Sequence, residues 1–406
     1  MICVETGCVS LNKAGEELCG DRVETVRSGG TVTMVLADGL GSGVKANILS
    51  SLTSKILGTM IASGMKTADA VQTVAQTLPV CSVRHIGYST FSVLHLNPDG
   101  AASLIQYENP PAILLRRGKR VPYPTRKSQI FGKEILETDL TLGEGDMVLL
   151  ISDGVVHAGA GLAYNNRWQF EDVCAFVERS YTPQTTAKGM AAALAGACRQ
   201  LYIGEPGDDA TVAVARLRAR QAVDVMVGPP ADPDDAGRMV LDFLAGEGKK
   251  AVCGGTTSQI VADALGEPLK VDAETGEAEV PGVGPPGDSL PGDSLPGRGI
   301  PPVATLKGID LVTEGVLTIS RMLEILDRYS LPGEPEDDLS EQDGASRLAH
   351  LLIEEATDVR FFVGTAVNPA HRRPDFPANL AVKAKLVGQL AEGLKALGKS
   401  AELRFY

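Results

Sequence analysis

The pattern of apolar and polar residues changes its period near residue 217. Up to that point the apolar residues form short runs bounded by turn residues, which is typical of strands. The clearest runs lie at residues 31–37, 91–96, 103–108, 112–117, 146–152 and 210–217. Two longer stretches, Val44 to Ser63 and the alanine-rich segment Thr186 to Tyr202, predict helices. Many strands with a few long helices predict an α+β domain in which helices cover antiparallel sheets.

After that point, predicted strands alternate with predicted helices. The strands lie at residues 222–228, 250–255, 308–315, 359–365 and 401–406. The helices lie at residues 234–245 and 256–265, before residue 329, and at residues 345–355 and 378–397. This alternation predicts a separate α/β domain with a mostly parallel sheet. We therefore expect one domain at residues 1–217 and a second, of different fold, at residues 222–406.

Two segments of the second half have the composition of loops. Residues 280–302 are rich in Pro and Gly and contain a tandem PGDSL repeat, which predicts a flexible insertion. Residues 331–344 read LPGEPEDDLSEQDG and predict an exposed acidic loop.

Composition limits the class of protein. The formal charge of −13 over 406 residues argues against nucleic acid or an anionic membrane as the main partner. The apolar stretches fall short of the roughly 20 residues that cross a bilayer, and no signal peptide is visible. The seven cysteines form no CxxC pair, which favours a reducing compartment. We expect a soluble, cytoplasmic protein.

Aspartates stand at the ends of several predicted strands of the first half. One run ends at Asp38 in ADGLGSG, another ends just before Asp153 in SDGVVHAG, and a third begins after Asp208 and Asp209 in GDDATVAV. In an antiparallel sheet the end of one strand and the start of its neighbour share an edge, so these side chains can converge. Asp21, in CGDRVETV, precedes another short strand and can join them.

Clustered carboxylates repel one another unless a cation neutralises them. Carboxylate oxygens suit magnesium or manganese rather than zinc, and Gly39 and Gly154 allow close backbone approach and offer carbonyl ligands. Two such ions, about 3.5–4 Å apart, could hold a hydroxide and a phosphoryl oxygen together. The alternative is that each Asp-Gly is a simple turn. The ordered set of motifs favours the metal site.

These motifs resemble those of the sporulation-protein-E type of the PPM family, which are bacterial metal-dependent serine/threonine phosphatases. The resembling segments are ADGLGSGVKA, YENPPAILLRRG, LGEGDMVLLISDGVVHAG and GDDATVAVARL, in family order across residues 1–217. The resemblance implies an αββα sandwich that binds two manganese or magnesium ions. It implies catalytic metal ligands at Asp21, Asp38, Asp153 and Asp208, assisted by the Gly39 carbonyl, with Asp209 in a supporting or structural role.

The sequence departs from the family at two places. Val156 and His157 stand where family members often carry an acid or threonine, and the phosphate-binding arginine of the eukaryotic branch has no clear counterpart. Lys45 could contact phosphate, but we favour an exposed helix lysine.

The resemblance implies hydrolysis of phosphoserine or phosphothreonine on a regulatory protein by attack of a water held between the two ions. That partner protein would be the substrate. The helix from Val44 onward would be placed to shift the ADG loop, so gating by this helix is a hypothesis.

The second half resembles no family that we can name. Its predicted parallel strands end in small or polar residues, and ligands of parallel sheets bind at such ends. The candidate contacts with a small anionic ligand are Gly254, Gly255, Thr256, Thr257, Glu314, His371, Arg372 and Arg373. The alternative is that the glycines and threonines are helix caps and turns. Cys253 is interpreted as a buried small hydrophobe.

Three functions remain open from the sequence. The first is a metal-dependent phosphatase with a C-terminal module that senses a ligand or binds a partner. The second is a non-enzymatic signalling scaffold, a pseudophosphatase that binds partners, and the presence of all four expected acids favours the enzyme over it. The third, in which the second half is an independent enzyme on a small metabolite, is supported by no motif. The substrate protein, the metal and the oligomeric state are not predicted.

Overall fold

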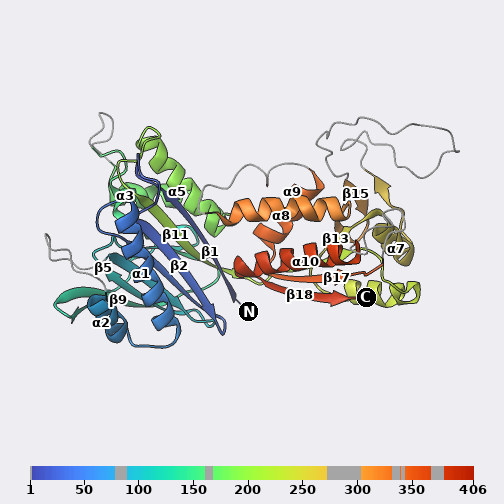
Figure 1. The fold of residues 1–406 in the computed structure, drawn as a ribbon, viewed down its shortest axis with the longest axis horizontal. Coiled ribbons are helices and arrows are strands. Elements are labelled where there is room, and N and C mark those ends of the chain that lie inside the picture. Colours follow the sequence, from blue (N-terminus) through green and yellow to red (C-terminus); the bar gives the residue numbers. More distant parts are fainter. Residues whose placement is uncertain are drawn as a thin grey trace. The chain divides into compact units, whose positions relative to one another are not determined.

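The chain forms two compact units, which are described separately (Figure 1). Unit 1 comprises Met1–Ala219 and Leu331–Pro335, and unit 2 comprises Arg220–Ser330 and Glu336–Tyr406. The computed structural model describes residues 2–77, 89–160, 168–271, 303–331, 339, 343–366 and 379–406. The predicted insertion at 280–302 and most of the predicted acidic loop at 331–344 lie outside these residues.

Unit 1 contains two antiparallel sheets. The first sheet has the order β1 (Ile2–Leu11), β11 (Ala210–Ala219), β10 (Asp146–Ile151), β6 (Ile113–Arg116) and β7 (Lys119–Arg120). The second has the order β2 (Asp21–Ser28), β3 (Thr31–Asp38), β4 (Thr90–Leu96), β5 (Ala101–Tyr107), β9 (Lys133–Thr141) and β8 (Arg126–Ile130).

The two sheets pack face to face, and helices cover the outer face of each. Between the sheets, Met34 and Leu36 of β3 share a core with Ala213 and Leu217 of β11. Helices α1 (Gly43–Ala62) and α2 (Thr67–Thr77) share a core with the second sheet. Helices α4 (Phe170–Ser180) and α5 (Ala187–Leu201) do the same with the first sheet. This four-layer arrangement confirms the predicted αββα sandwich.

Strand β11 shows why the sequence reads as continuous apolar runs rather than as alternation. Val212 and Val214 belong to the core under the helices, whereas Ala213 and Ala215 belong to the core between the sheets. A strand that is buried on both faces has no reason to alternate. Strands β1, β8 and β9 and helices α2 and α4 were not predicted, because polar residues interrupt their apolar positions.

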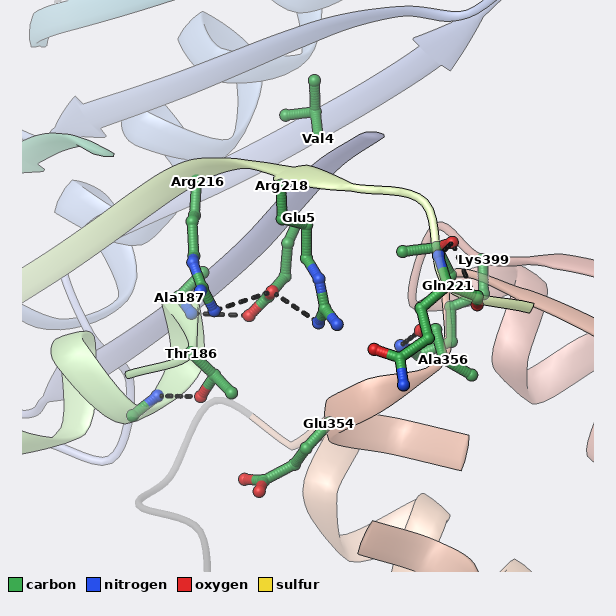
Figure 2. Close-up of polar contacts among 12 residues, drawn as sticks. Val4, Glu5, Thr186, Ala187, Arg216, Arg218, Gln221, Glu354, Ala356 and Lys399 are labelled. Atoms are coloured by element: carbon green, nitrogen blue, oxygen red, sulfur yellow. Dashed lines mark hydrogen bonds and ion pairs between the residues drawn. The ribbon is translucent and has the colours of Figure 1, made fainter. Parts of the chain in front are cut away.

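A partly buried carboxylate fastens helix α5 to the first sheet (Figure 2). Glu5 of β1 accepts a hydrogen bond from the main-chain N–H of Ala187, at 2.6 Å, and its other oxygen lies 3.2 Å from Arg218 and 3.7 Å from Arg216. At Gly7 an added Cβ would lie 2.3 Å from the amide nitrogen of Lys188. The start of α5 is therefore held against β1 by charge and by close backbone contact.

Unit 2 is a three-layer α/β sandwich. Its sheet has the order β14 (Lys270–Val271), β15 (Val303–Leu306), β16 (Ile309–Thr313), β13 (Lys249–Cys253), β12 (Ala222–Val227), β17 (Asp358–Val363) and β18 (Ser400–Phe405). The pairs from β16 to β18 are parallel, which confirms the predicted mostly parallel sheet, and the antiparallel edge of β14 and β15 was not predicted.

Helices lie on both faces of this sheet. Helices α6 (Ala236–Leu244) and α7 (Gly255–Leu265) pack on one face. Helices α8 (Val316–Ser330), α9 (Gly344–Ala349) and α10 (Asn379–Ala396) pack on the other, together with a π-helical turn at His350–Glu355. Within the described ranges, none of the helices is both long and apolar enough to span a membrane.

One buried ion cluster lies inside unit 2. Asp224 of β12 is fully buried, and its oxygens lie 2.7 and 2.8 Å from Arg360 and 3.2 Å from the Lys250 ammonium. At Gly246 an added Cβ would lie 1.9 Å from an Asp224 oxygen. The glycine therefore leaves the room that this cluster occupies.

Candidate metal centre

Two of the predicted ligands face each other in the second sheet. Asp21 is the first residue of β2 and Asp38 the last residue of β3, and the two are partners in the register of these antiparallel strands. Asp21 is buried, with 4% of its surface exposed. The sequence argument that a strand start and a neighbouring strand end share an edge is correct for this pair.

The other predicted ligands come from the first sheet. Strand β10 ends at Ile151, Ser152 precedes the short helix α3 (Asp153–Val156), and Asp208 and Asp209 precede β11. The main chain of Ser152 donates to the Thr211 carbonyl at 3.0 Å, and the Thr211 N–H donates to the Ser152 hydroxyl at 2.8 Å. These bonds fix the end of β10 beside the start of β11. The predicted set is thus drawn from two facing sheets rather than from one.

Three glycines allow the loops around these aspartates to touch. An added Cβ at Gly39 would lie 2.0 Å from the Ala46 carbonyl oxygen of α1, and one at Gly154 would lie 2.1 Å from the Asp209 carbonyl oxygen. At Gly20, next to Asp21, it would lie 2.8 Å from an Asp209 carboxylate oxygen. The last contact joins the two sheets at the aspartate cluster.

The aspartates act on one another electrostatically. Burial, followed by repulsion from Asp21, Asp153, Asp208 and Asp209, raises the pKa of Asp38 to about 9. Burial also raises the pKa of Asp21 to about 7, against a lowering by the nearby Ser152 and Thr211 hydroxyls. Desolvated carboxylates that repel one another favour the protonated form unless a cation is present.

Several buried carboxylate oxygens have no partner. Among the described residues, both oxygens of Asp21 and one of Asp209 make no hydrogen bond, although the Ser152 and Thr211 hydroxyls lie close enough to Asp21 to influence its pKa. The other oxygen of Asp209 accepts from the main-chain N–H of Lys13 at 3.0 Å. Buried acceptors are seldom left unpaired, so this oxygen-rich group fits a hard cation in its chemistry.

The aspartate side chains do not surround a single metal position. Across the described ranges, no three His, Cys, Asp or Glu side chains are grouped so that they could hold an ion. The ligand set Asp21, Asp38, Gly39, Asp153 and Asp208 therefore stays a prediction. Asp208 accepts the main-chain N–H of Asp209 at 3.0 Å, whereas Asp209 tethers Lys13.

The sequence reasoning missed three polar residues around the aspartates. Ser152 and Thr211 lie beside Asp21, and Lys13 partly offsets the rise that burial and Asp153 cause in the pKa of Asp208. The serine of SDG and the threonine of DDAT are polar residues next to apolar runs, which was a usable signal. The sequence contains no comparable signal for Lys13, because its position depends on a hydrogen bond between its main-chain N–H and Asp209.

The predicted contacts of the second half lie at the carboxyl ends of strands of unit 2. Gly254, which precedes α7, has φ of 117° and donates its N–H to the Thr313 carbonyl at 2.9 Å. Gly255 and Thr256 are the first residues of α7, Thr257 is buried, and Glu314 follows β16. His371, Arg372 and Arg373 lie outside the described residues. Cys253 is buried, as its interpretation requires.

Gly154→Ala is expected to destabilise unit 1 by about 1–3 kcal/mol, because the added methyl must displace backbone at Asp209. Urea unfolding followed by Trp168 fluorescence measures this, since the one tryptophan of the chain lies in unit 1. The matched control is Gly143→Ala, where an added Cβ meets no atom within 4 Å. Equal effects at both positions would contradict the prediction.

Comparison with known proteins agrees with the fold of unit 1. Residues 28–218 match the family model described as Stage II sporulation protein E (SpoIIE). The chain is similar to stage II sporulation protein E of Bacillus subtilis strain 168, with 25% identity over 174 residues, which are 41% of this chain and 20% of that protein. The chain thus spans about a fifth of that relative's length. These matches confirm the predicted resemblance of the first half.

Several solved structures are similar to about half of the chain. The PP2C phosphatase domain of Bacillus subtilis SpoIIE, solved with a fragment of its regulatory domain, has a TM-score of 0.45 and 21% identity, covering 52% of this chain and 63% of that one. The RsbU and RsbW domains of a Mycobacterium tuberculosis protein have a TM-score of 0.45 and 18% identity, covering 60% and 68%. RsbX, solved in complex with magnesium, has a TM-score of 0.38 and 20% identity, covering 53% and 100%.

Proposed function

We propose, from the match of residues 28–218 to the SpoIIE family, that unit 1 is a metal-dependent protein serine/threonine phosphatase acting on a phosphorylated regulatory protein. The observation that carries the proposal is that Asp21 of β2 and Asp209, which precedes β11, are both buried and have carboxylate oxygens that make no hydrogen bond among the described residues. Buried carboxylates that repel one another are unfavourable unless a cation neutralises them.

Manganese or magnesium ions would be held by Asp21, Asp38, Asp153 and Asp208, with the Gly39 carbonyl. Such ions, two in the proposed site, neutralise charge on the phosphoryl group and lower the pKa of water. The residues of the chain would position both the ions and the substrate. The main chain of Lys13 is held by Asp209, whereas its ammonium has no hydrogen-bond or ion-pair partner among the described residues and is therefore available to an incoming phosphate. Lys45 is exposed in the first turn of α1, which suits the favoured interpretation of a helix lysine.

Helix α1 is placed to gate this site. Its residue Ala46 touches Gly39, and the Asn47 side chain donates to the Cys19 carbonyl at 2.8 Å, two residues before Asp21. A displacement of α1 would therefore move both loops that carry the second sheet's aspartates. This supports the gating hypothesis.

Phosphate release from p-nitrophenyl phosphate and from a phosphoserine peptide tests the proposal. We expect turnover with manganese or magnesium and none in EDTA, because the carboxylates alone repel a phosphate dianion. The second readout is the urea midpoint of unit 1, measured by Trp168 fluorescence. It should rise when metal is added, because a cation that binds the folded state stabilises that state. Absence of turnover with both metals would contradict the enzyme.

The same measurements separate a second candidate, a pseudophosphatase scaffold. The observation that favours it is that no described group of three side chains is arranged to hold an ion. A scaffold would bind the phosphoserine peptide without releasing phosphate under any metal condition. Turnover that requires metal would exclude it.

For unit 2 we propose a small anionic ligand at the carboxyl edge of its sheet. Support comes from the parallel topology and from the helix α7 that begins there, whose free N–H groups favour an anion. A cytoplasmic location remains a prediction.

A further inference from the structure

The order of strands in unit 2 defines a switch point between β12 and β17. From β12 the chain proceeds to β13 and β16 on one side, and it then returns to β17 and β18 on the other. In open parallel sheets, the crevice outside the carboxyl ends of the strands at such a reversal is where ligands bind. For unit 2 these ends are Val227 and Val363.

A lysine of α10 lies at this place. The Lys383 ammonium donates to the Gly364 carbonyl at 2.8 Å and lies 3.3 Å from the Ala366 carbonyl, both just after β17. Gly228 follows β12, and an added Cβ there would lie 2.2 Å from the same nitrogen. A side chain at position 228 would therefore exclude the ammonium, which occupies the space between the two strand ends.

Among the residues that the structure describes, no carboxylate matches the charge of Lys383. Its partners are carbonyl oxygens, and no described Asp or Glu lies within ion-pair distance of it. Other cations inside this unit, Lys250 and Arg360, share the buried Asp224. Burial lowers the pKa of Lys383, as expected for a cation without a counter-charge. An ammonium in this state gains from an anion beside it.

Glycines lie at the carboxyl ends of the central parallel strands. Gly228, Gly254, Gly315 and Gly364 follow the four central parallel strands, directly or after one residue. The tight contact of Gly364 with Pro229, where an added Cβ would lie 2.1 Å from the carbonyl oxygen, joins the loops after β12 and β17. The positive end of the α10 dipole adds to the potential near Lys383.

We propose that the switch point between β12 and β17 is a binding site for a small anionic molecule, with a phosphate or carboxylate group at the Lys383 ammonium. This proposal rests on the anionic ligand proposed for unit 2 and gives that ligand a place in the fold. The proposal does not depend on catalysis by unit 1.

Titration of the full chain in EDTA with inorganic phosphate, pyrophosphate and succinate tests the site. EDTA removes metal from unit 1. Far-UV circular dichroism follows the unfolding of both units, whereas Trp168 fluorescence follows unit 1 alone. The circular dichroism change that has no counterpart in fluorescence therefore reports the unfolding of unit 2. We expect one of the probes to raise this midpoint in the wild type. Lys383→Met should weaken its apparent affinity by about ten-fold or more, because a charge-assisted hydrogen bond is lost.

The matched control is Lys385→Met, which removes an exposed lysine two residues further along α10 and should leave the affinity unchanged. Lys383→Gln, which keeps a donor but removes the charge, replaces Lys383→Met if that variant does not fold, and the same loss is expected. The proposal is overturned if none of the three probes shifts the wild type. It is also overturned if the Lys383 variants bind as the wild type does, which would make Lys383 a clamp between loops. Phosphatase activity in metal is measured separately, so failure of one proposal leaves the other standing.

Discussion

Asp21→Asn is expected to abolish metal-dependent phosphate release and, at the same time, to stabilise the metal-free protein. The Asp21 carboxylate is buried, neither of its oxygens makes a hydrogen bond within the described part of the chain, and burial raises its pKa to about 7. Without a cation this charge is unfavourable, and its removal should contribute about 1–3 kcal/mol. Activity should fall to background, because asparagine is a much poorer ligand of hard cations.

The difference in the free energy of unfolding between Asp21→Asn and the wild type should change with pH in one direction. The pKa of Asp21 in the folded state, about 7, lies above its unfolded value of 3.8, so the folded state binds more protons between these values. Wild-type stability in EDTA should therefore fall as pH rises from about 4 to about 7. The gain from Asp21→Asn should be largest above that range and should disappear below it.

Urea unfolding by Trp168 fluorescence, in EDTA and again with manganese, measures both effects. Metal should stabilise the wild type and not the variant. The control is Asp139→Asn, the same chemical change at a side chain that is 79% exposed, which should alter neither activity nor stability. An Asp21→Asn variant that is less stable than the wild type in EDTA, or that keeps its activity, would contradict the assignment.

Asp224→Ala is expected to destabilise unit 2 by about 3–5 kcal/mol. The change leaves Arg360 and Lys250 without the fully buried carboxylate that each now contacts. A buried cation that loses its partner costs far more than the pair contributed. Urea unfolding followed by circular dichroism measures the loss, with the Trp168 transition as the reference for unit 1.

The control for this change is Glu392→Ala on α10. Glu392 is 73% exposed and pairs with Lys395 at 2.8 Å, so its loss should cost less than about 0.5 kcal/mol. If Asp224→Ala has an equally small effect, the cluster does not hold the sheet together as inferred.

Both folds could be predicted because burial leaves a clear trace in the sequence. Strands β3, β10 and β11 are covered on both faces, so their apolar runs stand out. Strand β9 and helix α4 expose part of their surface and alternate with charged residues, which hides them from the same reasoning. Strands β14 and β15 have only two and four residues and lie on either side of a long segment rich in Pro and Gly, so no apolar run marks them in the sequence.

The candidate site was predictable in its members but not in its geometry. The motifs at the strand ends identify the aspartates, yet nothing in their spacing shows that Asp21 and Asp38 belong to one sheet and that Asp153 follows a strand of the other. Lys383 was not predicted at all. Its position depends on the space that Gly228 leaves 155 residues earlier in the chain, which no local pattern records.

The division of the aspartates between two sheets has a consequence for folding kinetics. Strand β1 pairs with β11, and Ile2 lies opposite Ala219. The first sheet therefore needs contacts between residues that are far apart in the sequence, and such contacts form slowly. Asp153 and Asp208 meet Asp21 and Asp38 only after this sheet has docked on the other. A cation bound at this place would therefore act after the rate-limiting step of folding. It should slow the unfolding of unit 1 and leave its refolding rate unchanged.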